Sequence, residues 1–479
     1  MKRTAKNTGA LLLALCTVLL SSAACGENAG EPLSSGAPAQ ETAAETEAAF
    51  VPADYLPEAD YGGKEFHILT AAEQWYSTYE SEQTGDVLND AVYDRNRTVE
   101  ERFNTDLCYD CFNGYSAGMS SVKTALTESV LSGTAEYDLV VADGYYVSNY
   151  VFDNLLSPLD DFIAFDFTRE HWLTDTINEH RLAGKAYFAV GYLSVNTMRQ
   201  TIILFWNKKI SEQYDLGNFY DLVLDGKWTK DKMKELALEA TADTDGDTTM
   251  TENDCWGVIS SAVDAIGPMQ TAMGHKYTSS ADGSFVMRPL DERLVGINDF
   301  LYEMLNGKNY TFLLNSEVAK MTAMFAADKG LFLLYRLDMS ETEDIRNMDN
   351  YGFLPLPKYD EAQEDYTGAG GCDVAAIPTL VDDAEMSSVL CDAIAAYGYY
   401  DVLPVYYDVV LTTKYARDEN SVKMLDIIVK NIYTDPAMTF SGLCNNIYYS
   451  IGKKNIASSY EKTLSGITKN IDKALANLG

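Results

Sequence analysis

Apolar runs and periodic apolar positions divide the chain beyond residue 60 into strands and helices. KEFHILT (residues 64–70) is a short β-rich run that predicts a buried strand. Asp86 is placed to cap a helix that follows. Four apolar residues share one face of that helix: Leu88, Val92, Val99 and Phe103. A second helix is expected over about 120–132 and the next strand over 136–144 (EYDLVVADG).

Strands and helices alternate at spacings that predict parallel βαβ units. Ligands of such sheets bind in the loops that follow the carboxyl ends of the strands. Two loops qualify, residues 70–86 and 143–150, and both carry aromatic side chains beside polar groups. The candidate ligand contacts in these loops are Trp75, Tyr76, Asp143, Tyr145 and Tyr146.

The second half of the chain continues the α/β pattern. Strand-like runs cover 184–194, 199–211, 330–339 and 350–360. Thr229 is placed to cap a helix between the second and third of these runs. That helix has its apolar residues on one face: Met233, Leu236, Ala237 and Ala240. No internal repeat of solenoid or propeller period is present.

The N-terminus carries an export signal. Basic residues at 2, 3 and 6 precede an apolar run (residues 10–20) that is too short to span a bilayer. The small residues that follow lead to Cys25, as in the lipobox of bacterial lipoproteins, although Ser22 stands where an apolar residue is preferred. The alternative is ordinary signal-peptidase cleavage after residues 22–24. We expect residues 1–24 to be the signal peptide and Cys25 to carry lipid.

Composition narrows the possible partners. The chain has 479 residues, which favours two domains, and a formal net charge of −36. Such a chain repels nucleic acid and anionic lipid. Residues 25–58 are rich in small, polar and acidic side chains and predict a flexible tether, and no later apolar run is long enough for a membrane helix. We therefore expect a body held at the extracellular face of the cytoplasmic membrane.

Six cysteines remain after Cys25, too few for a disulfide framework in a body of this size. Cys108 and Cys111 have redox spacing, but they follow a helix and start a strand, whereas redox pairs open a helix. Structural thiols or one local disulfide are favoured.

The segment DTDGDTTMTEND (residues 243–254) has the spacing of a calcium loop. Its oxygen ligands would come from Asp243, Asp245, Asp247, Thr249 and Asp254. Two features weaken the match: the last ligand is Asp rather than Glu, and Thr248 stands where the turn prefers Gly. The alternatives are a structural Ca²⁺ site and a solvated acidic loop without metal.

An ordered series of segments resembles the extracellular solute-binding lipoproteins of ABC importers. The likeness is to the carbohydrate-type group that includes maltodextrin-binding proteins, in its Gram-positive anaerobe form, and it covers nearly the whole chain after the tether. The segments are LNDAVYDRNRTVEERFN, AEYDLVVADG, GKAYFAVG, ILFWNKKI, FYDLVLDGKWTKDKMKELA, YGFLPLPKYDEAQEDY and LTTKYARDENSVKMLDII.

This resemblance implies a two-lobed α/β fold of the periplasmic-binding-protein type (type II). A hinge would join lobes formed by 59–195 plus about 362–410 and by 196–361 plus about 411–479. The implied partners are a small solute, expected to be a sugar, and ABC permease subunits, and the protein would be a monomer. The order of the elements adds candidate contacts in the second lobe: Arg199, Gln200, Tyr335, Arg336 and Asp338.

Other functions remain open at this stage. A secreted glycosidase would need two suitably placed carboxylates, which an acidic chain always offers. The sequence contains no GxSxG, HExxH or GxxxxGK[ST] motif. A lipoprotein that binds peptides or another solute would use the same lobes.

Overall fold

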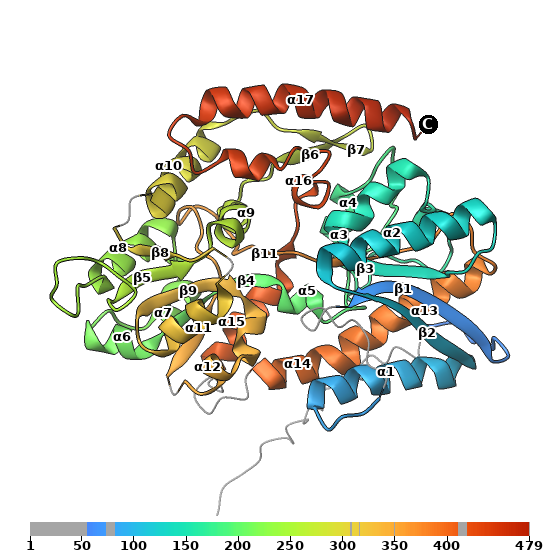
Figure 1. Cartoon of the computed structure of the whole chain (residues 1–479), viewed down its shortest axis with the longest axis horizontal. Coiled ribbons are helices and arrows are strands. Elements are labelled where there is room, and N and C mark those ends of the chain that lie inside the picture. Colours follow the sequence, from blue (N-terminus) through green and yellow to red (C-terminus); the bar gives the residue numbers. More distant parts are fainter. Residues whose placement is uncertain are drawn as a thin grey trace, which may run out of the picture. The chain divides into compact units, whose positions relative to one another are not determined.

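The computed structural model describes residues 55–72, 82–306, 309–315, 317–348, 350–410 and 419–478, which belong to one compact unit. The unit is a mixed α/β structure built on two main sheets (Figure 1). Cys25, Trp75, Tyr76, the predicted signal peptide and residues 25–54 of the predicted tether (25–58) lie outside the described residues. At the end of that tether, Leu56 is buried.

The first sheet has the strand order β12-β3-β1-β2. β1, β2 and β3 are parallel and β12 joins β3 antiparallel, so the predicted βαβ units are confirmed. The strands are β1 (Lys64–Ala72), β2 (Thr105–Asn113), β3 (Leu139–Asp143) and β12 (Asp373–Ala376). Helix α1 (Val87–Phe103) begins after Asp86, whose carboxylate accepts the backbone N–H groups of Leu88 and Asn89. Helix α2 (Tyr115–Ser132) connects β2 to β3.

The second sheet has the order β13-β11-β4-β9-β5-β8, with β10 also paired to β4. The strands are β4 (Thr201–Asn207), β5 (Trp256–Ser260), β8 (Thr311–Leu313), β9 (Gly330–Arg336), β10 (Tyr351–Leu354), β11 (Gly368–Gly370) and β13 (Ile432–Tyr433). A separate hairpin is formed by β6 (Thr278–Ala281) and β7 (Ser284–Met287). β4, β5 and β9 are fully buried apart from the half-buried Arg336, which explains their continuous apolar sequences.

Helices cover both sheets (Figure 1). The remaining α-helices are α3 (Gly144–Val147), α4 (Thr174–Glu179), α5 (Asn196–Arg199), α6 (Lys208–Gln213), α7 (Phe219–Leu224), α8 (Lys230–Ala240), α9 (Ala262–Ala272), α10 (Glu292–Asn306), α11 (Val318–Ala326), α12 (Glu343–Arg346), α13 (Ala384–Tyr397), α14 (Leu403–Val410), α15 (Glu419–Lys430), α16 (Pro436–Thr439) and α17 (Ile456–Ala476). Thr229 caps α8 as predicted, by accepting the Lys232 N–H. No helix among the described residues is both long and apolar enough to cross a membrane.

The chain passes between the two sheets at short segments. α5 leads into β4 of the second sheet, and residues 371 and 372 join β11 of the second sheet to β12 of the first. The predicted limits of the lobes stay a prediction.

One predicted strand is wrong. Residues 184–194 form only isolated bridges, such as Ala189 to Ala375 and Gly191 to Trp172. Phe188 and Val190 are buried, so the run is apolar because it packs in the core and not because it belongs to a ladder. Cys108 and Cys111 lie within β2, and neither is part of a disulfide.

Candidate ligand-binding site

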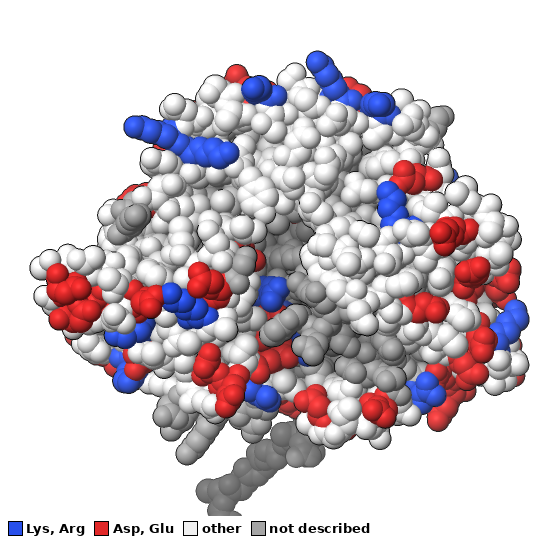
Figure 2. Space-filling model, in the orientation of Figure 1, with Lys and Arg blue, Asp and Glu red and all other residues white. Residues whose placement is uncertain are grey.

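A cavity of about 260 Å³ lies at the carboxyl ends of β3 and β9, beside the passage at residues 371 and 372. We call it the cleft; the surface is hollowed near the middle of the face shown in Figure 2. Its lining residues are Tyr115, Asp143, Gly144, Tyr145, Gln200, Ile202, Val263, Asp264, Gly267, Pro268, Arg336, Gly370, Gly371, Cys372, Thr434, Met438, Thr439, Tyr448 and Tyr449. The ends of parallel strands in two sheets thus supply one site, as expected for α/β folds.

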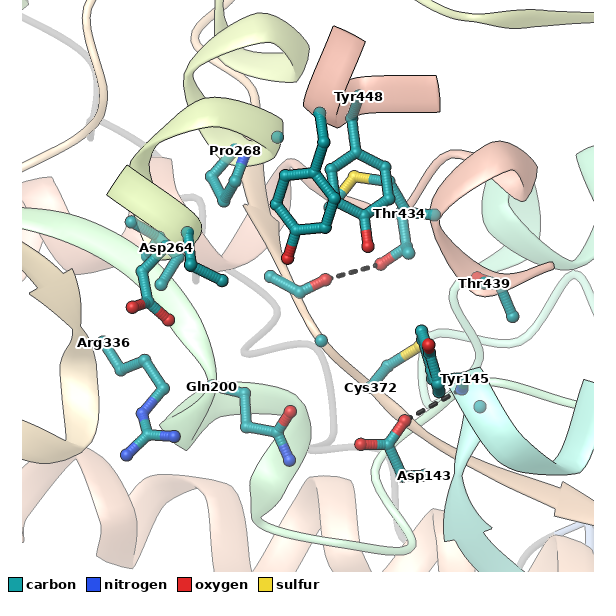
Figure 3. A pocket seen from close by; sticks show the side chains of 18 of the residues that line it. Asp143, Tyr145, Gln200, Asp264, Pro268, Arg336, Cys372, Thr434, Thr439 and Tyr448 are labelled. Carbon is teal, nitrogen blue, oxygen red and sulfur yellow. Dashed lines mark hydrogen bonds between the residues drawn. The ribbon is translucent and has the colours of Figure 1, made fainter. Parts of the chain in front are cut away.

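Asp143 and Tyr145 form the wall contributed by the first sheet (Figure 3). Asp143 is buried and accepts hydrogen bonds from the Tyr115 hydroxyl (2.7 Å) and the Tyr145 backbone N–H (2.8 Å). Within the described part of the chain it forms no ion pair, and burial raises the pKa of its carboxyl group. This wall therefore offers a desolvated acceptor next to a 40% exposed tyrosine ring.

Arg336 and Asp264 stand on the opposite side of the cleft (Figure 3). The Arg336 Nε donates to Asp338 Oδ1 at 3.3 Å. Burial raises the pKa of Asp264, and the positive charge of Arg336 partly opposes this rise. Burial likewise raises the pKa of Asp338 to about 6. A planar guanidinium held in this way can donate to two ligand oxygens at once.

Gln200 supplies an unpaired amide at the cleft. The residue is 7% exposed, and its side-chain Nε2 has no hydrogen-bond partner among the described residues. The Oε1 lies so close to Gly371 that a Cβ there would stand 2.2 Å from it, so a larger residue at 371 would displace the Gln200 side chain. Buried amides are almost always hydrogen-bonded, so the free Nε2 favours a ligand oxygen as its partner.

Tyrosine rings complete the lining. Tyr448 and Tyr449 lie side by side, with ring centroids 4.4 Å apart and planes inclined by 53°. Tyr449 is 39% exposed. Together with Tyr115 and Tyr145 they give the cleft apolar flat faces beside its charged and amide groups. Such a surface suits a ligand with C–H faces and several hydroxyl groups.

The structure brings four of the residues predicted from sequence into the lining: Asp143, Tyr145, Gln200 and Arg336. Four others lie close by without lining the cavity. Tyr146 packs edge-on against Tyr115 and Tyr145. Arg199 makes two hydrogen bonds to Glu341. Tyr335 is buried beside the Arg336 guanidinium, and Asp338 orients that group.

The lining residues that sequence reasoning missed include Tyr115, Asp264, Tyr448 and Tyr449. Asp264 could have been predicted from the sequence, because it follows the carboxyl end of β5 by four residues. The tyrosine pair at 448 and 449 carried no local signal, because long-range packing alone brings it to the cleft.

The acidic loop lies apart from the cleft. Asp243, Asp245 and Asp247 are exposed, and one carboxylate oxygen of each lies within 4.8 Å of the others. Thr248 adopts a positive φ of 67°, as the turn requires. These three carboxylates fit a calcium ion. Asp254 does not join them: its buried carboxylate accepts the backbone N–H groups of Thr244 (2.8 Å) and Thr251 (2.7 Å).

Thr249 is held within the same loop by its backbone N–H, which donates to Asp247 Oδ1. The hydrogen bonds from backbone amides lower the pKa of Asp254, so this carboxylate stays charged while it fixes the loop.

No family model matches this sequence, and no curated protein matches it. Solved structures do match. The galacto-N-biose/lacto-N-biose I-binding protein of an ABC transporter from Bifidobacterium longum, solved with lacto-N-biose, has a TM-score of 0.59 at 12% identity. The match covers 87% of this chain and 98% of that one. The fold is that of the two-lobed ABC solute-binding proteins.

Two further structures support this assignment of fold. An ABC substrate-binding protein from Listeria monocytogenes in complex with cycloalternan gives a TM-score of 0.51 at 10% identity, covering 87% of this chain and 98% of that one. UgpB from Mycobacterium tuberculosis in complex with glycerophosphocholine gives a TM-score of 0.53 at 15% identity, and the match covers 86% of this chain and 99% of that one. The family resemblance seen in the sequence is therefore confirmed at the level of the fold.

Proposed function

We propose that this protein binds a carbohydrate, a mono- or oligosaccharide, in the cleft and delivers it to an ABC permease. The observation that carries the proposal is the lining of the cleft, where tyrosine rings share one cavity with Gln200, whose buried Nε2 has no partner among the described residues. Sugar rings present C–H faces to aromatic rings and hydroxyl oxygens to amide and guanidinium donors. The sugars bound by two of the structural neighbours add support.

The location and partners are part of the same proposal. Lipid on Cys25 would hold the body at the extracellular face of the membrane, where permease subunits would receive the solute. We propose that the protein acts as a monomer and that the acidic loop binds Ca²⁺ for structural purposes only.

The test is calorimetric titration with a panel of mono- and oligosaccharides. Gln200→Ala should weaken binding of the best sugar by roughly 1 kcal/mol, because a ligand oxygen loses its donor. Tyr449→Ala should weaken it by about 1 kcal/mol through loss of a stacked ring. Tyr302→Ala is the matched control, because Tyr302 is similarly exposed on α10 and does not line the cleft.

Two results would contradict the proposal. Binding of peptides or amino acids with no response to any sugar would move the function to another solute. Release of monosaccharide from a bound oligosaccharide would show an enzyme, in which Asp143 and Asp264 would be the first carboxylates to replace.

A further inference from the structure

A second cavity, of about 830 Å³, shares no lining residue with the cleft. Five of its sixteen lining residues are aromatic: Tyr192, Tyr399, Tyr400, Tyr407 and Trp172. We call it the tyrosine groove. Its volume lies in the range of small-molecule sites.

The groove is built by an unusual backbone. Tyr399 and Tyr400 belong to a π-helical segment, η5 (Gly398–Val402), between α13 and α14. Gly398 makes this packing possible, because a Cβ there would stand 1.9 Å from the backbone oxygen of Tyr192. π-Helical turns are rare and occur often at functional sites.

The rings are inclined to one another and do not form a parallel stack. The centroids of Tyr192 and Tyr399 are 5.1 Å apart with planes at 58°, and those of Tyr399 and Tyr400 are 5.0 Å apart at 89°. Burial raises the pKa of Tyr399 and raises that of Tyr400 to about 12, so both phenols are neutral at physiological pH. Neutral rings set at such angles present electron-rich faces in several directions.

The charges around the groove are mainly negative. Three carboxylates line it, from Glu170, Asp175 and Asp426, and all three residues are exposed. Among the described lining residues Lys430 is the single basic one. Glu170 lies against the ring cluster, since its Oε2 accepts the Tyr400 hydroxyl at 3.5 Å.

We propose that the tyrosine groove is a binding site for an organic cation, a protonated amine or a quaternary ammonium group. Aromatic faces attract a cation through the ring quadrupole, and the carboxylates at the rim neutralise its charge. The same three carboxylates would repel an anion. The proposal is independent of the sugar in the cleft, because the two sites have no lining residue in common.

The experiment compares choline with its neutral carbon isostere, dimethylbutanol, by isothermal titration at physiological salt. Choline is expected to bind saturably with one site per chain, and the isostere is not. Tyr400→Ala should weaken choline binding by about 2- to 30-fold, the range expected for a cation–π contact. Glu170→Gln should weaken it several-fold. Trp172 lines the groove, so its fluorescence gives a second readout.

Two control variants test diffuse attraction to this acidic chain. Glu239→Gln and Tyr302→Ala alter exposed side chains that do not line the groove, and both should bind choline as the wild type does. Melting temperatures of all variants check that they fold. Binding that does not saturate, that survives both groove substitutions, or that is equal for the isostere would overturn the proposal.

Discussion

Asp373 is a buried carboxylate surrounded by neutral donors. It accepts hydrogen bonds from Ser194 Oγ (2.7 Å) and Asn196 Nδ2 (2.9 Å), and in the sheet it stands opposite Asp143. Burial raises the pKa of Asp373 to about 6, and these hydrogen bonds only partly oppose the rise. The folded protein therefore holds this proton more tightly than the unfolded chain does.

This difference predicts a pH effect at a single residue. The free energy of unfolding should fall as the pH rises from about 4, the usual value for aspartate, through about 6, and the loss should be complete above that. Asp373→Asn has no such proton. Relative to the wild type, the variant should therefore gain up to about 3 kcal/mol between pH of about 4 and about 7. Urea titrations across this pH range measure the free energy of unfolding of both proteins. If the two free energies changed with pH in parallel, the prediction would be wrong.

At the scale of elements, sequence patterns predicted the helix starts and buried strands that depend on neighbouring residues alone. The sequence predicted the helix caps at Asp86 and Thr229. It also predicted the buried strands β4 and β9 from their continuous apolar runs. The run at 184–194 was misread because burial makes a core segment apolar whether or not it joins a sheet. In the cleft, residues at strand ends were predictable. Tyr448 and Tyr449 were not, because they reach it from a 3₁₀ segment near the end of the chain.

The acidic loop gives a prediction for one element. If Asp243, Asp245 and Asp247 hold calcium, chelation should lower the melting temperature, because an ion bound only to the folded state stabilises it by mass action. Asp243→Ala with Asp245→Ala should abolish this response and leave sugar affinity largely unchanged. Calorimetry with and without chelator tests both. Loss of sugar binding on chelation would show that the metal serves the ligand site directly.

At the scale of the whole molecule, the cleft takes its lining from both sheets, so a ligand can contact both walls at once. A ligand of this kind favours the closed population of a hinged protein. We expect the radius of gyration from X-ray scattering to decrease when the best sugar is added. A sugar that does not bind should leave it unchanged. An equal radius with and without bound sugar would contradict closure.

Membrane attachment is also a property of the whole chain. Cys25→Ala should release the protein into the medium, because the lipid on this residue is the expected anchor. Detergent-phase partitioning measures this change. Partitioning equal to that of the wild type would show that another segment attaches the protein.

The two cavities border the same connecting segments. Gln200 and Thr434 line the cleft, while Tyr192 and Ile432, a few residues earlier on the same two segments, line the tyrosine groove. Any coupling between a sugar in the cleft and a cation in the tyrosine groove is reciprocal. Whatever factor a bound sugar imposes on the affinity for the cation, the cation must impose on the affinity for the sugar. The four binding steps form a closed cycle, so any three measured dissociation constants fix the fourth.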